Sequence, residues 1–184
     1  MPFSSKAVAN YLLDRAEADG KTLNPMQLQK LVYYGHGWHL AVTNRPLIDE
    51  RIEAWTYGPV VPTLYHEFKD CGGGAIRERA TSVRLVANPK TGRKTLVEFI
   101  APSIDDASDP GQRVLARDVL DKVWRVYGGF SAVELSQMTH ERGGPWDVTR
   151  EANPGIRGVD INDDLIREYF RAKGLANERA QFVR

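Results

Sequence analysis

The sequence predicts a mainly α-helical (α+β) domain that carries one inserted β-hairpin. Two helix starts are clear, because Asn24-Pro25 and Asp109-Pro110 each join a capping side chain to a proline that needs no amide donor. Apolar residues recur at helical spacing over most of the chain, whereas residues 82–101 show the spacing of two short strands. A chain of 184 residues is most simply one domain with a sizeable core, so we expect one unit over residues 1–184.

The first two helices are expected before residue 45. Ser4 or Ser5 can cap a helix that ends at Gly20, and a second helix begins at Pro25 and reaches about Val42. A helical wheel of this second helix separates an apolar face from a mixed face. The apolar face holds Leu28, Leu31, Val32, Gly35, Trp38 and Val42, and the mixed face holds Gln29, Lys30, Tyr33, His36 and Gly37.

The wheel predicts the surroundings of Gly35, of Trp38, and of Tyr33 and His36. Gly35 on the apolar face indicates close approach by another helix, because a glycine inside a helix otherwise costs about 1 kcal/mol relative to alanine. Trp38 should lie in the core. Tyr33 and His36 should face outward or toward a second layer of structure.

The middle of the chain is less regular. Residues 47–57 are expected to form a connector with a short extended piece, and Gly58-Pro59 a turn. A short helix should follow and stop before Gly72; its inward residues are Leu64, Tyr65 and Phe68. Residues 82–101 then form the hairpin, with its turn in residues 88–93. Because an isolated hairpin is marginally stable in water, we expect it to lie against the helices.

Three further helices are expected in the second half. One begins at Pro110 and ends at Gly128-Gly129, and its inner side holds Ala116, Val119, Val123, Val126 and Tyr127. Ser131 and Glu134 form a capping box for a short helix that reaches about His140. Residues 143–146 turn into another short segment. The last helix places Leu165, Ile166, Tyr169 and Phe170 inward, and residues 174–184 are expected to fray into a flexible tail.

The composition narrows the class of protein. Lys and Arg number 25 and Asp and Glu 24, so the near-neutral balance gives no electrostatic argument for nucleic acid as the main partner. The single cysteine cannot form an internal disulfide, which fits a reducing compartment. No signal-like N-terminus and no run of about 18 apolar residues is present, so we expect a cytoplasmic protein that makes no membrane contact.

Three blocks of the sequence resemble the Panacea domain of SocA-like antitoxins, a bacterial and phage-associated family also described as GepA-like. Their order and approximate spacing match the family from about Ala7 to Phe170, and the hairpin and tail lie outside them. The first block is Leu28-Gln29-Lys30-Leu31 with Tyr33, Tyr34 and Trp38; the second is Glu53-Ala54-Trp55 with Tyr57-Gly58-Pro59-Val60 and Tyr65; the third is Leu135-Ser136, Thr139-His140 and Pro145-Trp146.

The resemblance implies an antitoxin of a two-gene toxin–antitoxin system. Such proteins neutralise a separate protein toxin by direct contact, and the toxin is expected from the adjacent gene. SocA-like members also act as proteolytic adaptors that deliver the toxin to the ClpXP protease. The resemblance implies no catalytic residue, no metal and no cofactor.

Aromatic and histidine residues in these blocks are the candidates for partner contact, because Tyr and Trp dominate interface hot spots. Core packing is the ordinary alternative for aromatics near a turn, and the hairpin and tail are an alternative contact surface. The candidate contact residues are Tyr33, His36, Tyr57, Val60, His140 and Trp146. The motif residues expected to be structural are Leu28, Gln29, Lys30, Leu31, Tyr34, Trp38, Trp55, Gly58, Pro59 and Pro145.

Two other classes of function stay open at this stage. A hydrolase or transferase would need His36, His66 and His140 to meet in a cleft, although no metal-binding spacing accompanies them. Cys71 is a poor nucleophile, because the end of a helix disfavours a thiolate. A DNA-binding regulator could use the basic hairpin region. The preferred interpretation is that these basic residues keep an exposed strand edge solvated, and the next is that they form a complementary patch for an acidic toxin. The basic residues are Arg77, Arg79, Arg84, Lys90, Arg93 and Lys94.

Overall fold

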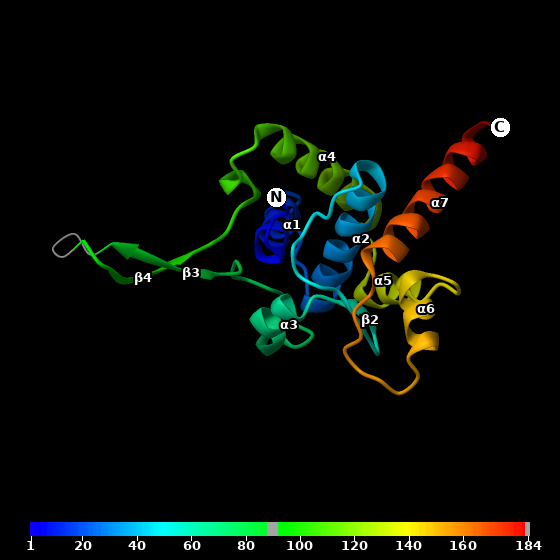
Figure 1. Cartoon of the computed structure of the whole chain (residues 1–184), viewed down its shortest axis with the longest axis horizontal. Helices are drawn as coiled ribbons and strands as arrows, with labels where there is room; N and C mark the ends of the chain where they lie inside the picture. Colours follow the sequence, from blue (N-terminus) through cyan, green and yellow to red (C-terminus); the bar gives the residue numbers. More distant parts are fainter. Residues whose placement is uncertain (88–91, 183–184) are drawn as a thin grey trace.

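The computed structural model describes residues 1–87 and 92–182 (Figure 1). Over these residues the chain is mainly helical with two separate two-stranded antiparallel sheets, which confirms the predicted fold class. The helices are α1 (Ser5–Ala18), α2 (Pro25–Thr43), α3 (Pro62–Phe68), α4 (Pro110–Tyr127), α5 (Ala132–Thr139), α6 (Pro145–Ala152) and α7 (Asp163–Phe182). The strands are β1 (Glu53–Trp55), β2 (Gly58–Val60), β3 (Ser82–Ala87) and β4 (Lys94–Ile100), and the short 3₁₀ turns are η1 (Lys69–Cys71) and η2 (Ile104–Asp106).

The helices begin where the capping signals predicted. Ser4 caps α1, and Asn24 forms a capping box ahead of α2. Asp109 caps α4 by accepting backbone N–H bonds from the first turn, and Ser131 forms the predicted capping box of α5. Local side-chain chemistry therefore sets these boundaries, since each cap satisfies N–H groups that a helix leaves unpaired.

Helix α2 lies at the centre of the molecule, and α1, α4, α5 and α7 pack around it (Figure 1). It is consequently buried on both faces of the predicted wheel. Tyr33 meets the ring of Phe170 on α7 at 5.7 Å, and His36 bonds Asp163 at 3.0 Å, so these two residues face a second layer. Val42, expected inward, is 65% exposed near the C-terminal end of the helix.

Two glycines of α2 allow neighbouring helices to approach closely. A Cβ at Gly35 would lie 2.8 Å from Leu120 Cδ2 on α4, which confirms the predicted close approach. A Cβ at Gly37 would overlap the ring of Phe170, so α7 is packed against the opposite side of the helix even more tightly. The helical wheel placed Gly37 on the mixed face and gave no sign of this second contact.

Three details differ from the sequence-based expectation. The turn between β1 and β2 is formed by residues 56–57, and Gly58 and Pro59 belong to β2. Tyr65 is 42% exposed, whereas Leu64 and Phe68 are buried as predicted. Val126 is 58% exposed, because Trp124 and Leu120 occupy the inner side of α4 alongside the predicted residues.

The β3–β4 hairpin projects from the helical body (Figure 1), so the expectation that it lies against the helices is wrong. Its strands pair antiparallel, and the cross-strand pairs Val83–Phe99 and Leu85–Val97 share one face. All four side chains of that face are more than half exposed. Arg84 pairs with Glu98 at 2.7 Å on the other face. Residues 88–91, which include most of the predicted turn, lie outside the described residues.

Helix α7 continues past Gly174 to Phe182. A Cβ at Gly174 would be 3.6 Å from Trp38 on α2, so this point of the helix lies beside the body. Most of the segment 174–184, expected as a tail, is therefore helical, and residues 183–184 lie outside the described residues. None of the helices described is both long and apolar enough to cross a membrane.

Candidate functional site

Side chains of α2 hold one side of the β1–β2 turn. The Gln29 amide forms two bonds with the main chain of Val61, donating to its carbonyl at 3.1 Å and accepting from its N–H at 2.8 Å. Lys30 Nζ donates to the carbonyl of Pro59 at 2.9 Å. Two adjacent polar side chains of a buried helix thus satisfy main-chain groups of β2 and of the residue that follows it.

Side chains of α5, of its C-cap residue and of α6 hold the other side of the same turn. Ser136 Oγ donates to the carbonyl of Tyr57 at 3.0 Å, and Trp146 Nε1 donates to the carbonyl of Trp55 at 2.7 Å. His140 Nε2 lies 3.3 Å from the carbonyl oxygen of Thr56. The rings of His140 and Trp146 meet edge to face at 3.9 Å, so the two anchors also support each other.

These contacts fix the backbone of the turn. The carbonyls of residues 55, 56, 57 and 59 each have a side-chain partner on a helix or at a helix end. Gly58 has a φ of +98° and lies between two of these anchors. A Cβ there would be 2.9 Å from Lys30 Nζ and would overlap Thr139 Oγ1, so glycine is required both by conformation and by space.

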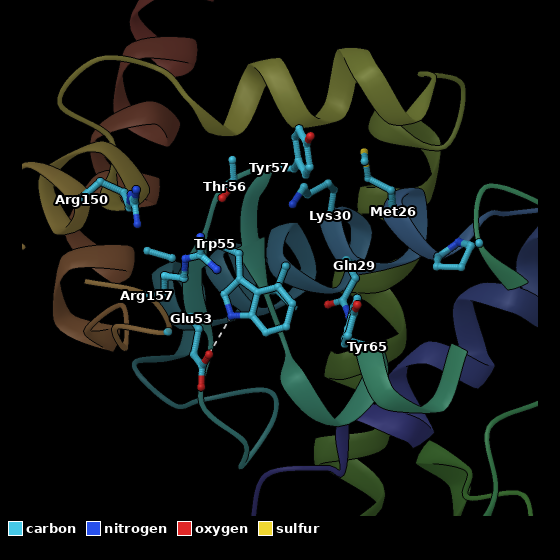
Figure 2. A pocket seen from close by; sticks show the side chains of 15 residues that line it. Met26, Gln29, Lys30, Glu53, Trp55, Thr56, Tyr57, Tyr65, Arg150 and Arg157 are labelled. Carbon is cyan, nitrogen blue, oxygen red and sulfur yellow. Dashed lines mark hydrogen bonds between the residues drawn. The ribbon is translucent and has the colours of Figure 1, made fainter. Parts of the chain in front are cut away.

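A cavity of about 720 Å³ opens beside this turn (Figure 2). Tyr57 is 69% exposed at the tip of the turn, on the rim of the cavity. Trp55 and Tyr65, with ring centroids 4.8 Å apart, form an aromatic wall. Other side chains that line the cavity are those of Met26, Gln29, Lys30, Glu53, Val60, Arg150 and Arg157.

The charged groups of the cavity are unevenly paired. Lys30 is only 1% exposed, and its burial lowers the pKa of the ammonium to about 7. Glu53 is buried, accepts a bond from Trp55 Nε1 at 2.7 Å (the dashed line in Figure 2) and pairs with Arg51 at 3.0 Å. Glu53 therefore fixes the orientation of the Trp55 indole, and its negative charge is already engaged.

The candidate contact residues are divided between core, scaffold and surface. Tyr33 and His36 are buried inside the molecule, and their side chains do not reach the surface. Val60 is 8% exposed and lines the cavity, while Tyr57 stands at its rim. His140 and Trp146 are half-buried anchors of the turn.

The motif residues expected to be structural have clear packing roles. Leu28 and Leu31 lie in the core, and Pro145 begins α6. Tyr34 stacks on Tyr127 at 4.1 Å, and Trp38 Nε1 donates to the Tyr127 hydroxyl at 3.2 Å. Arg150, Arg157 and Met26, which line the cavity, were absent from the sequence-based candidates. Single arginines and a methionine outside the motifs carry no pattern that could have identified them.

The three histidines of the enzyme hypothesis have different surroundings in the structure. His36 contacts Asp163, His66 is exposed beside the ring of Tyr65, and His140 holds the β1–β2 turn, so the three histidines lie in separate settings. Within residues 1–87 and 92–182, no cluster of His, Cys, Asp or Glu side chains could hold a metal ion. His39 donates from Nδ1 to the carbonyl of Arg45 at 2.8 Å, and its burial lowers its pKa, as expected of a core histidine.

The basic region of the hairpin is partly neutralised by acidic neighbours. Arg79 pairs with Asp14 at 2.7 Å and also with Glu17, and Arg84 pairs with Glu98. These pairs reduce the positive charge available for a nucleic-acid backbone. Lys90 lies outside the described residues.

Comparison with known proteins covers the same region. The family model described as the SocA-like antitoxin, Panacea domain, matches residues 28–147, a range that contains all three sequence blocks. The curated protein Antitoxin SocA of Caulobacter vibrioides (strain NA1000 / CB15N) is 34% identical over 170 residues, which cover 91% of this chain and 82% of that protein. No solved structure matches.

Proposed function

Because the chain belongs to the SocA-like antitoxin family with a Panacea domain, we propose that it neutralises a separate protein toxin by direct contact. The proposed mechanism is stoichiometric binding in the cytoplasm, without a catalytic step. The toxin is expected from the adjacent gene. An interface of this kind typically buries about 1,600 Å² in total, with a few aromatic or arginine anchors supplying most of the affinity.

The observation that carries this proposal is the exposed Tyr57 on a fixed turn. A binding residue on a mobile loop loses conformational entropy when it engages a partner, whereas a residue on an ordered backbone loses less. Anchors from α2, α5 and the start of α6 already order the turn. Tyr57 has a large amphipathic side chain, and the adjoining cavity offers room for a group of the partner.

A growth test with the adjacent gene examines the proposal. That gene is expressed alone and together with this protein, and a tagged copy of this protein is purified from the co-expressing cells. We expect toxicity that this protein relieves, with the two proteins purifying together. A harmless neighbour that is not captured contradicts the proposal.

The variant Tyr57→Ala makes the test specific to the surface. We expect weaker rescue and weaker capture with an unchanged thermal midpoint, because the Tyr57 side chain is mostly in solvent. Phe130→Ala is the control, since Phe130 is a partly exposed aromatic residue that does not line the cavity. Equal loss of capture in both variants contradicts a contact centred on Tyr57.

Delivery of the toxin to ClpXP is a second step that the family relationship suggests, and we propose to test it in the same cells. If the protein is an adaptor, rescue should be accompanied by disappearance of the toxin, and deletion of clpX should restore both the toxin and its toxicity. If masking alone is sufficient, the toxin should persist in complex and the deletion should have no effect.

A further inference from the structure

We propose that the cavity beside Tyr57 receives an acidic segment of the partner, in which a carboxylate side chain lies next to an apolar one. The inference rests on the proposed function, because the partner is taken to be the protein toxin. It adds the chemistry by which that partner is recognised.

The cavity carries an excess of basic side chains. Lys30, Arg150 and Arg157 line it, and in the part of the chain that the structure describes none of them pairs with a carboxylate. Glu53 is the single acid among the lining residues described, and it is engaged by Arg51 and by the Trp55 indole. The cavity therefore combines two unpaired arginines and one buried lysine with one carboxylate that already has partners.

Lys30 is almost completely buried beside the cavity. When Lys30 is protonated its ammonium has three N–H donors, and among the described residues its one acceptor is the carbonyl of Pro59. Charged groups in such surroundings are normally paired, because transfer of a lone charge out of water is costly. A carboxylate that enters the cavity would supply the missing partner from outside the chain.

Aromatic and basic side chains line the cavity together. In Figure 2 the two arginines lie on one side of Trp55, and Tyr65 and Gln29 lie on the other. An apolar side chain of the partner can contact the rings of Trp55 and Tyr65 while a neighbouring carboxylate reaches the cations. The volume of about 720 Å³ falls within the usual range of ligand pockets and accommodates a short segment rather than a whole helix.

The position of the cavity favours a protein segment over a free metabolite. Its rim includes Tyr57, which is the most exposed aromatic side chain near the turn. A segment that enters the cavity would therefore remain continuous with a partner surface covering Tyr57. Charged groups at such a place also speed association and make it sensitive to salt.

The main test compares arginine variants in binding to the co-expressed toxin. Arg150→Gln with Arg157→Gln should weaken the affinity by at least about ten-fold and flatten its dependence on salt. Arg125→Gln with Arg142→Gln removes the same charge from exposed residues outside the cavity and should leave the affinity nearly unchanged. Unchanged binding of the first pair, or equal loss in both pairs, overturns the inference.

The single variant Arg157→Gln distinguishes a loss of charge in the cavity from a loss of local structure. Arg150 also donates to the carbonyl of Ile156 at 3.0 Å, so its replacement can disturb the loop that follows α6. Arg157 is exposed, and its replacement removes charge without loss of a known internal bond. A single variant that melts like the wild type and binds the toxin with full affinity counts against the inference.

A peptide titration tests the chemistry without the toxin. N-acetyl-Phe-Glu-amide and N-acetyl-Phe-Gln-amide differ by one charge, and binding is followed through the indole N–H signal of Trp55 in ¹⁵N NMR spectra. We expect the Glu peptide to bind several-fold more tightly, with the preference lost in the Arg150/Arg157 double variant. Equal binding, or no shift with either peptide, overturns the inference.

Three outcomes distinguish a carboxylate site in the cavity, recognition of a protein segment and the proposed antitoxin function. Sodium acetate that shifts the same signal as strongly as the Glu peptide indicates a site for free carboxylates, which contradicts recognition of a protein segment. If the wild type captures no toxin while the peptides behave as expected, the proposed antitoxin function fails and the carboxylate site stands. If the toxin is captured and the arginine variants bind normally, the antitoxin function stands and the cavity proposal fails.

Discussion

Replacement of Lys30 by methionine should stabilise the protein at neutral and acidic pH. Lys30 is 1% exposed, and its burial lowers the pKa from 10.5 to about 7. A difference of this size corresponds to a penalty of about 5 kcal/mol on the charged form in the folded state. Methionine has a similar length and no charge, so it fills the same space without that penalty. It also loses the bond to Pro59, which is worth about 1 kcal/mol.

The sign of the pH dependence follows from where the proton is bound. Between pH 7 and 10.5 the unfolded chain holds a proton on Lys30 that the folded protein has lost, so the stability of the wild type rises with pH. The penalty is complete below pH 7 and absent above pH 10.5. We therefore expect Lys30→Met to raise the free energy of unfolding by about 4 kcal/mol at pH 6, with the gain falling by about 1.4 kcal/mol per pH unit above pH 7.

Guanidinium denaturation followed by tryptophan fluorescence at pH 6, 7.5 and 9 measures this difference. The comparison of variant and wild type cancels the other titrating groups, which the two proteins share. Lys122→Met is the matched control, because the Lys122 side chain is 63% exposed, and it should show no such trend. A difference between K30M and wild type that stays constant with pH, or a K30M protein that is less stable at pH 6, refutes the reasoning.

Three further substitutions test the packing. Gly37→Ala should destabilise the protein by about 2 kcal/mol or more, because the added Cβ overlaps the ring of Phe170 on α7. Gly129→Ala is the control and should cause no such loss, because its Cβ would have no neighbouring atom within 4 Å. Urea denaturation measures the difference between the two variants. Phe99→Thr should change the free energy of unfolding by less than about 0.5 kcal/mol and leave the thermal midpoint nearly unchanged, because the Phe99 side chain is 73% exposed. A clear fall in the thermal midpoint would show that this side chain packs against the rest of the protein. Trp146→Phe should lower the free energy of unfolding by about 1 kcal/mol, because it removes the hydrogen bond to the Trp55 carbonyl, and it should speed amide hydrogen exchange in β1. Unchanged exchange in β1 would contradict the anchoring role of Trp146.

The parts of the fold that local chemistry decides could be predicted from the sequence. The caps at Asn24, Asp109 and Ser131 were correct because a cap depends on residues within one turn of it. The hairpin of residues 82–101 was also predicted, because two β-rich runs lie on either side of a short turn-forming segment. The position of that hairpin relative to the helices could not be predicted. The pattern of two amphipathic strands does not indicate whether another part of the protein packs against their apolar face.

The candidate site was harder to predict, because its elements come from distant parts of the chain. The helical wheel of α2 assumes that one face is buried and the other is exposed to solvent. In the structure, α7 packs against the face that was assumed to be exposed. The wheel placed Lys30 and His36 on the mixed face, and both are 1% exposed because β2 and the start of α7 contact that face. The arginines of the cavity depend on the path of residues 150–158, which no periodicity describes.

The three sequence blocks meet at one piece of backbone, and we therefore expect the scaffold to tolerate different side chains at the tip of the β1–β2 turn. Gln29, Lys30, Ser136, His140 and Trp146 contact main-chain atoms of the turn and of the residues beside it. Main-chain carbonyls are the same for every residue type, so these anchors place few demands on the side chains at positions 56 and 57. Substitutions there can alter the partner without loss of the turn, while substitutions of the anchors should disturb recognition of any partner. The same division predicts that changes in specificity will map to the turn tip and the cavity rim.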